Sequence, residues 1–271
     1  MQKRVSCLVL CLALFVALSA HAAAAESSVG VVVDGVTLPE TTVTKVIDRN
    51  TYVSYWPVVC ALYPDATVAW ENGQSVARAE GLCLSVCPNA RYIVANGRYL
   101  YVPDAVQTEG ANILVPARVL AKALGAQVQW DQASSSVVFQ KGTGPIQSGD
   151  TYYNGEDLYW LSRIISAESG NQPLSGKIAV GNVVLNRVAN SKFPNTVKGV
   201  IFQKNQFTPA SSGSINRTPN AESVIAAKLC LDGANTVGNS LYFVNPRVSP
   251  NSWASRNRTC VATIGAHAFF A

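Results

Sequence analysis

Histidine is almost absent from this chain of 271 residues, which has two histidines and only 14% charged residues. His21 lies in an N-terminal segment that we expect to be removed, so His267 remains alone. Because a catalytic metal site generally needs more than one histidine, a metal-dependent amidase is nearly excluded. Cys83 and Cys87 have no nearby partner pair to complete a zinc site. We therefore expect neither a metal nor a cofactor.

Signatures of three other functional classes are also missing. A serine triad could use His267, but the sequence has no Gly-x-Ser-x-Gly elbow. A cysteine peptidase would need Cys230 or Cys260 beside His267, and both fit better as buried or disulfide-bonded cysteines. Nucleic-acid binding is poorly supported, because there is no basic helix and no aromatic RNA-binding signature.

The first residues have the pattern of an export signal. Two basic residues precede an apolar run, Val5–Ala20, and then small residues, which predicts a signal peptide over residues 1–25 with cleavage after Ala22 or Ala25. No later stretch is long and apolar enough to span a bilayer. We therefore expect a secreted protein without stable membrane insertion.

Export bears on the cysteines. Five of the seven lie beyond the predicted signal peptide, namely Cys60, Cys83, Cys87, Cys230 and Cys260. An exported protein can oxidise cysteines, and the odd number leaves at least one thiol free or intermolecular. Cys230 with Cys260 is the candidate disulfide.

Charge divides unevenly along the chain. Residues 26–150 have 8 Lys+Arg and 11 Asp+Glu, a net of −3, whereas residues 151–271 have 11 and 5, a net of +6. Only the C-terminal half is basic, which suits an anionic partner such as a cell wall polymer.

An internal duplication organises the N-terminal half, residues 29–140. Both Thr51–Ala79 and Ile113–Gln140 read as a short strand, an amphipathic helix, a strand ending in Trp, a polar turn and another strand. The matched pairs, 60 to 62 residues apart, are Val53 with Val115, Leu62 with Leu124, and Trp70 with Trp130. We expect both tryptophans to be core residues. An Asp34-Gly35 turn also predicts a hairpin over Val29–Leu38.

The second copy resembles the copper amine oxidase N-terminal-like domain. The motif residues are Asn96-Gly97-Arg98, Leu114-Val115-Pro116-Ala117-Arg118, Leu120-Ala121, Ala123-Leu124-Gly125-Ala126 and Val128-Gln129-Trp130-Asp131. This domain occurs as an accessory module on exported bacterial proteins, so the resemblance implies packing or wall attachment. It does not imply copper, since the region has no histidine.

A Gly-, Ser- and Pro-rich linker over residues 141–152 leads to the C-terminal domain, residues 153–271. Its first helix, Leu158–Gly170, with Asn154 as the N-cap, places Glu168 on the apolar face behind Ile164 and Ile165. Such a carboxyl should be partly buried, with a raised pKa. The alternative is a core-edge glutamate paired with Arg163 or Arg187.

Further helices are predicted at Gly176–Ala189 after a Ser175 cap, from Thr196 or Asn195 through Phe202, and from Thr218-Pro219 to Leu231. Strands are predicted at Ser240–Val244 and Thr259–Thr263. The C-terminal domain is thus mainly helical with a small β-sheet. With the duplicated α/β module before it, the chain as a whole is α+β.

Residues 158–270 resemble the SleB-type spore cortex-lytic and cell wall hydrolase family. The motifs are Ala167-Glu168, Ala179-Val180, Val184-Leu185-Asn186-Arg187-Val188, Phe193-Pro194, Gln206-Phe207, Leu241-Tyr242-Phe243-Asn245-Pro246, Trp253 and Ile264-Gly265-His267-Phe269. The resemblance implies a lysozyme-like fold and a lytic transglycosylase that cleaves between N-acetylmuramic acid, or its lactam in spore cortex, and N-acetylglucosamine. It departs from the family at Ser169 or Asn171 and at Phe270, and no common wall-binding repeat is present.

The resemblance assigns Glu168 as the catalytic acid. The other carboxylates of this domain lie at predicted helix ends or exposed faces, and one carboxylate suffices if the sugar's own 6-hydroxyl is the nucleophile. The candidate substrate-binding residues are Gln206, Phe207, Tyr242, Asn245 and His267. Alternatives remain open: Tyr242 as a strand core residue, Asn245 as a turn former, and His267 as a residue that closes the sheet.

The predicted partner is peptidoglycan, in the cell wall or the spore cortex, with a role in sporulation or germination. Two alternatives remain open, a conventional muramidase on the same fold and an inactive wall-binding or spore structural protein. The sequence gives no prediction of the oligomeric state.

Overall fold

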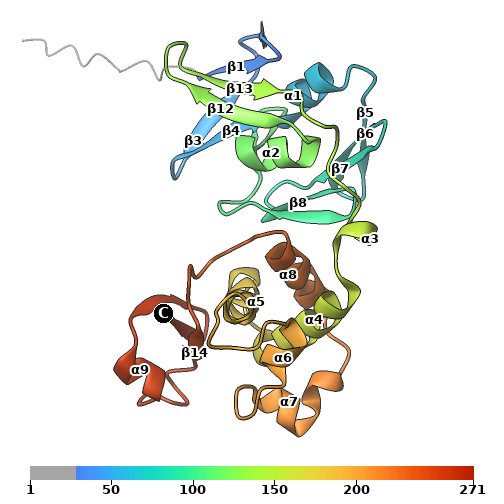
Figure 1. Ribbon diagram of the computed structural model, residues 1–271. Coiled ribbons are helices and arrows are strands. Elements are labelled where there is room, and N and C mark those ends of the chain that lie inside the picture. The colour runs from blue at the N-terminus through green and yellow to red at the C-terminus, as the bar shows by residue number, and fades with distance from the viewer. Residues whose placement is uncertain (1–28) are drawn as a thin grey trace, which may run out of the picture.

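The computed structural model describes residues 29–271 (Figure 1). The predicted signal peptide lies outside these residues. The described chain mixes α and β structure, which confirms the fold class at that level. Within residues 29–271, no helix has the length and apolar character needed to cross a membrane.

The N-terminal half is built from strands and two short helices. They are β1 (Gly30–Val33), β2 (Val36–Thr37), β3 (Thr44–Ile47), β4 (Asn50–Ser54), α1 (Tyr55–Leu62), β5 (Thr67–Glu71), β6 (Gln74–Ala79), β7 (Leu82–Val86), β8 (Tyr92–Ala95), β9 (Arg98–Tyr101), β10 (Gln107–Glu109), β11 (Asn112–Pro116), α2 (Ala117–Leu124), β12 (Gln127–Asp131) and β13 (Ser136–Gln140). Asp34 and Gly35 both have positive φ and close the predicted first hairpin.

The two sequence copies meet about an approximate two-fold axis. Strands β4 and β11 pair antiparallel, and the register places Val53 directly opposite Val115, its match in the other copy. The hairpin β12–β13 pairs through β13 with β1, while β5–β6 continues through β7 to β8–β9. The β12–β13 hairpin of the second copy thus shares a sheet with β1 and β2, which precede the first copy. The β5–β6 hairpin of the first copy shares a sheet with β8 and β9, which precede the second copy. The two copies form one core.

The core role expected for the two tryptophans is wrong. Trp70 is 62% exposed and Trp130 is 47% exposed. Both lie on edge strands, β5 and β12, whose inner neighbours β6 and β13 supply the buried side chains. A tryptophan that ends an edge strand remains beside solvent even when the strand pattern is regular.

The C-terminal half is mainly helical. Its elements are α3 (Gly149–Tyr152), α4 (Gly155–Ser169), α5 (Leu174–Val188), α6 (Val197–Ile201), α7 (Thr208–Ser212), the 3-10 turn η1 (Ser214–Asn216), α8 (Ala221–Leu231), β14 (Tyr242–Val244), α9 (Trp253–Asn257), β15 (Cys260–Ile264) and β16 (His267–Phe270). Helix α5 is buried on all sides from Gly176 to Val184 and packs against both α4 and α8.

Two predicted helix starts change, and one strand was not predicted. Helix α5 begins at Leu174 after Pro173, not at Gly176, and α8 begins at Ala221, where the Asn220 side chain accepts a hydrogen bond from the backbone of Ser223. Strand β16 was not predicted, although it is the middle strand of the sheet β14-β16-β15. All four of its residues are buried, so it lacks the alternation by which a half-buried strand is recognised.

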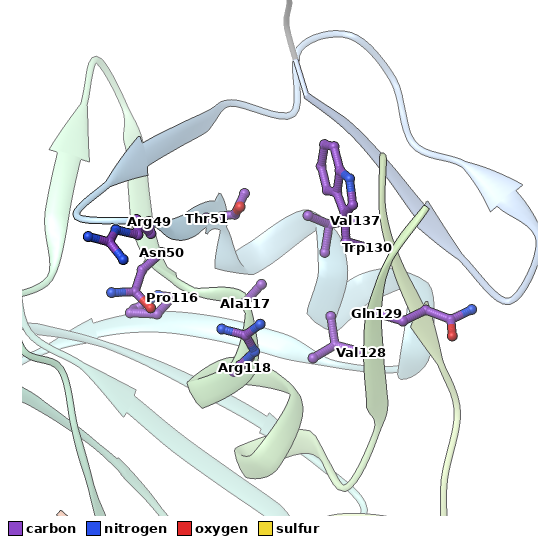
Figure 2. A pocket seen from close by; sticks show the side chains of 10 residues that line it. All are labelled: Arg49, Asn50, Thr51, Pro116, Ala117, Arg118, Val128, Gln129, Trp130 and Val137. Carbon is purple, nitrogen blue, oxygen red and sulfur yellow. The ribbon is translucent and has the colours of Figure 1, made fainter. Parts of the chain in front are cut away.

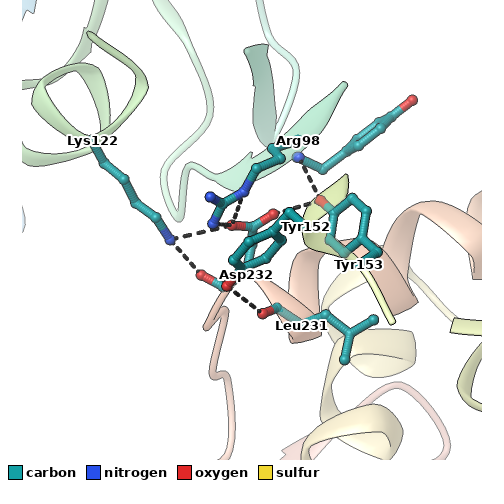
Figure 3. A network of polar contacts seen from close by, with 7 residues as sticks. Arg98, Lys122, Tyr152, Tyr153, Leu231 and Asp232 are labelled. Atoms are coloured by element: carbon teal, nitrogen blue, oxygen red, sulfur yellow. Dashed lines mark hydrogen bonds and ion pairs between the residues drawn. The ribbon is translucent and has the colours of Figure 1, made fainter. Parts of the chain in front are cut away.

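A buried polar network joins the two halves (Figure 3). The Asp232 carboxylate, after α8, accepts hydrogen bonds from the Arg98 guanidinium and the Tyr153 hydroxyl, and the Lys122 ammonium lies 3.4 Å from it. The Arg98 guanidinium also lies 3.3 Å over the Tyr152 ring. Burial is the main cause that raises the pKa of Tyr153. The predicted linker therefore connects two packed halves, and part of it is α3.

Candidate active site

Glu168 sits at the carboxyl end of α4. The Asn154 side chain accepts hydrogen bonds from the backbone of Glu156 and Asp157 at 2.9 and 3.0 Å, which caps the first turn as predicted. Ile164 and Ile165 are fully buried, and Glu168, one turn further on, is half-buried. Burial raises the pKa of this carboxyl, which favours its protonated form.

Glu168 has no partner among the described residues. Arg163 stacks on the Tyr159 ring at 3.6 Å, and the Arg187 Nε donates to the Leu241 carbonyl at 2.8 Å. Neither arginine forms an ion pair with Glu168, so the alternative of a paired structural glutamate is not what the structure shows. The carboxyl is thus half-buried and unpaired.

The end of α4 is held in place from α8. The Asn220 amide nitrogen donates to the Gly170 carbonyl at 3.1 Å, and its backbone N–H donates to the Ser166 hydroxyl at 3.2 Å. These bonds satisfy groups that a helix terminus otherwise leaves open. They fix the backbone on both sides of Glu168.

The other carboxylates of the C-terminal domain are engaged elsewhere. Glu156 pairs with Lys198, Glu222 with Lys177, and Asp232 belongs to the network between the two halves. Asp157 lies at the opposite end of α4, roughly 16 Å along the helix axis from Glu168 at 1.5 Å per residue. A two-carboxylate glycosidase needs its carboxyl groups about 5 to 9.5 Å apart, so Asp157 cannot serve as the second.

Two predicted substrate-binding residues lie in the core instead. Phe207 is 4% exposed and His267 is 8% exposed. Their rings pack against Phe243 at 6.4 and 5.3 Å, so direct contact with substrate is not supported. Burial lowers the pKa of His267. The buried imidazole lies on β16, the middle strand of the sheet, which fits the alternative of a structural role in the sheet.

The other three predicted residues are more accessible. Tyr242 is half-buried, with its ring 5.5 Å from Trp253. The Asn245 side-chain oxygen accepts a hydrogen bond from the Arg247 backbone at 3.0 Å, which makes Asn245 a turn former. Gln206 is exposed in the loop before α7. The structure thus keeps Gln206 and Tyr242 as accessible groups and gives Asn245 a local structural role.

A cavity of about 450 Å³ lies between Gln172, in the loop after α4, and residues of the C-terminal sheet and its loops. Gln172, about one turn beyond Glu168, accepts a hydrogen bond from the Ala266 backbone at 2.8 Å. Gly265 beside it has a φ of +59°, which favours glycine, and an added Cβ would lie 2.2 Å from the Gln172 oxygen. The lining residues are Gln172, Pro246, Arg247, Thr263, Gly265 and Ala266. The sequence carried no signal for Gln172 or Arg247, because neither lies on a periodic face.

The predicted disulfide is wrong, since all five cysteines in residues 29–271 are free. Cys230 is buried in α8, where its sulfur would lie 2.6 Å from a Cβ added to Gly181. Cys260 is exposed on the edge strand β15. The two thiols therefore lie in different surroundings, one in the helical core and one on the surface. Burial raises the pKa of the Cys230 thiol and keeps it uncharged.

Comparison with known proteins confirms both resemblances. Residues 32–139 match the family model described as copper amine oxidase N-terminal domain, and residues 171–270 match the one described as cell wall hydrolase. The C-terminal half contains a cell wall hydrolase domain. The matched segment begins at Asn171, three residues after Glu168.

The relatives are spore cortex-lytic enzymes. The one from Bacillus cereus is 34% identical over 142 residues, 51% of this chain and 54% of that protein. The one from Oceanobacillus iheyensis is 33% identical over 117 residues, 43% of this chain and 42% of that protein. The solved catalytic domain of the germination-specific lytic transglycosylase SleB from Bacillus anthracis is 36% identical, covers 45% of this chain and 98% of its own, with a TM-score of 0.42. The chain spans about half the length of the curated relatives it matches.

Proposed function

We propose that the protein is a peptidoglycan lytic transglycosylase of the spore cortex or cell wall. It would cleave the bond between N-acetylmuramic acid, or muramic lactam, and N-acetylglucosamine, on a lysozyme-like fold spanning residues 153–271. The observation that carries the proposal is a single half-buried carboxyl, Glu168, which lies at the end of α4 and has no partner among the described residues. The cell wall hydrolase domain supports the substrate class.

One carboxyl can perform both proton transfers of this reaction. Protonated Glu168 donates its proton to the glycosidic oxygen as the bond to C1 of the muramic sugar breaks. The carboxylate then removes the proton of the C6 hydroxyl, whose oxygen bonds to C1 and closes the 1,6-anhydro ring. No water enters, so no second carboxylate is needed. The raised pKa of Glu168 provides the proton at the start.

The cavity beside Gln172, in the loop after α4, is a candidate sugar site. Its volume of about 450 Å³ is in the range of small-ligand pockets. Gln206 and Tyr242, the accessible residues among those predicted, are proposed to contact sugar hydroxyls, and Phe207 and His267 are proposed to support the site from the core. The net charge of +6 over residues 151–271 suits an anionic polymer.

We further propose that the protein is secreted to the wall or cortex and that residues 29–140 form its accessory module. The matched cell wall hydrolase domain and the cortex-lytic relatives support this location.

The test is mass spectrometry of fragments released from spore cortex and vegetative peptidoglycan. Wild-type protein should release fragments ending in anhydro-muramic acid, and Glu168→Gln should release none. Glu156→Gln, on the same helix but exposed, is the matched control and should stay active. Reducing ends would establish a muramidase instead. No fragments from either polymer would support the inactive wall-binding alternative.

A further inference from the structure

The two-fold arrangement of the N-terminal half produces two equivalent hollows. The first is lined by residues of the β3–β4 turn, the start of α2 and the β12–β13 hairpin (Figure 2). The second is lined by the β10–β11 turn, the start of α1 and the β5–β6 hairpin. An offset of 60 to 62 residues relates the linings: Arg49, Asn50 and Thr51 match Ala111, Asn112 and Ile113, while Pro116, Ala117 and Arg118 match Ser54, Tyr55 and Trp56.

The two hollows differ in their charge. Both arginines of the first hollow, Arg49 and Arg118, are matched in the second by uncharged residues, Ala111 and Trp56. The fold therefore does not require a cation at either position, since the other copy forms the same elements without one. The second hollow is also tied by hydrogen bonds, such as Tyr55 to Ser75 at 2.5 Å. Only the first combines two guanidinium groups.

Neither guanidinium is used by the fold. Arg49 and Arg118 are exposed, and within residues 29–271 they make no side-chain hydrogen bond, ion pair or aromatic contact. The nearby Asp131 carboxylate is already engaged by Ser134 and the backbone of Ala133. Two unpaired arginines facing one hollow are unusual on a segment whose net charge is −3 over residues 26–150.

The rest of the lining offers a polar group and an aromatic face. In the second hollow Ser54 donates a hydrogen bond to the Asn112 oxygen at 3.2 Å, but Pro116 replaces that serine in the first hollow. The matching oxygen, on Asn50, consequently has no such partner. Trp130, 47% exposed, stands across the opening from Arg49 and Arg118 (Figure 2).

We propose that this hollow binds a carboxylate of the peptide chains of peptidoglycan. A guanidinium matches a carboxylate with two parallel hydrogen bonds, and two of them bind it more tightly than one. The volume of about 80 Å³ admits such a group but not a whole disaccharide. The neighbouring apolar or sugar part rests on Trp130. The identity of the polymer rests on the proposed function, whereas the site itself lies in the other half of the chain.

The test uses the full chain with Glu168→Gln, so that the polymer is not cut, and measures co-sedimentation with insoluble peptidoglycan freed of phosphate-linked polymers. Adding Arg49→Ala and Arg118→Ala should weaken binding about tenfold or more. Adding Lys45→Ala and Arg78→Ala, which removes the same charge from the same module outside the hollow, should leave binding nearly unchanged. Equal binding by all variants would overturn the proposal. Unfolding midpoints show that each variant is folded.

Two further ligands identify the anion. Glycan strands whose peptides have been removed should bind the Glu168→Gln chain only weakly. This binding should be no stronger than that of intact peptidoglycan to the chain that also carries Arg49→Ala and Arg118→Ala. If untreated walls bind but walls freed of phosphate polymers do not, the ligand is a phosphate and the carboxylate assignment is wrong. Fragment release by the wild-type chain separates the two proposals. Binding without fragments contradicts the transglycosylase alone, and cleavage with arginine-independent binding contradicts this site alone.

Discussion

Asp232→Asn should unfold the protein at a markedly lower temperature. The substitution removes the charge that Arg98 pairs with across the two halves, and the Arg98 side chain is only 8% exposed. Leaving one member of a buried pair uncompensated costs about 3 to 5 kcal/mol. Lys122 would lose the charge of Asp232 at little cost, because it is 45% exposed and its ammonium keeps the hydrogen bond of 2.6 Å that it donates to the Asp232 backbone carbonyl. At roughly 2 to 4 °C per kcal/mol for a chain of this size, the midpoint should fall by about 10 °C.

The assay measures the midpoint of thermal unfolding by calorimetry, with Glu71→Gln as the matched control. Glu71 pairs with Arg78 on the surface of the N-terminal half, so the loss of this ion pair should leave the midpoint nearly unchanged. A second variant that replaces Arg98 with Met and Asp232 with Leu should recover much of the loss, because no charge is then buried alone. A midpoint for Asp232→Asn within about 1 °C of wild type would refute the reasoning.

Three further predictions concern other parts of the molecule. Burial raises the pKa of Glu168, so stability should fall as pH rises from the ordinary carboxyl pKa through the raised one; Glu168→Gln should therefore be more stable than wild type at pH 7 in urea unfolding, and equal or lower stability would contradict this. Gly181→Ala should destabilise the protein by about 1 to 3 kcal/mol, because its Cβ would lie 2.6 Å from the Cys230 sulfur, and Cys230→Ala should relieve the loss. Trp70→Ala should change stability by less than about 1 kcal/mol, against 3 to 5 for a core tryptophan; a core-sized loss in chemical denaturation would show that its exposure does not hold in solution.

Local signals predicted the ends and faces of single elements well. The Asn154 cap, the Asp34-Gly35 hairpin and the half-burial of Glu168 depend on residues within one or two turns of one another. Helix α6, capped by the Thr196 side chain, is a further example. Capping and periodicity act over such short spans, so the sequence displays them directly. Before α8, both Thr218-Pro219 and Asn220 can start a helix, and the helix begins at Ala221 after the Asn220 cap.

Tertiary position decided which apolar residues are buried. Trp130 and Phe207 are both large aromatic residues with polar neighbours in the sequence, yet one is 47% exposed and the other 4%. The difference follows from an edge strand in one case and a helical core in the other. Cys230 and Cys260 likewise differ, because Cys230 lies on the side of α8 that packs against α5, whereas Cys260 lies on an edge strand. Sequence patterns do not say which strand of a sheet will be outermost.

The sequence by itself determined the two family-related segments, the duplication and the helix that carries Glu168 on its apolar face, because each of these is a pattern along the chain. Only the tertiary structure decided that β4 and β11 pair with Val53 opposite Val115, and that the last hairpin of each copy joins a sheet with strands that precede the other copy. It also decided that Arg98 meets Asp232, and that Arg49 and Arg118 share one hollow. These contacts join residues far apart in the chain, and folding selects them through packing and burial of the whole molecule, which no local pattern records.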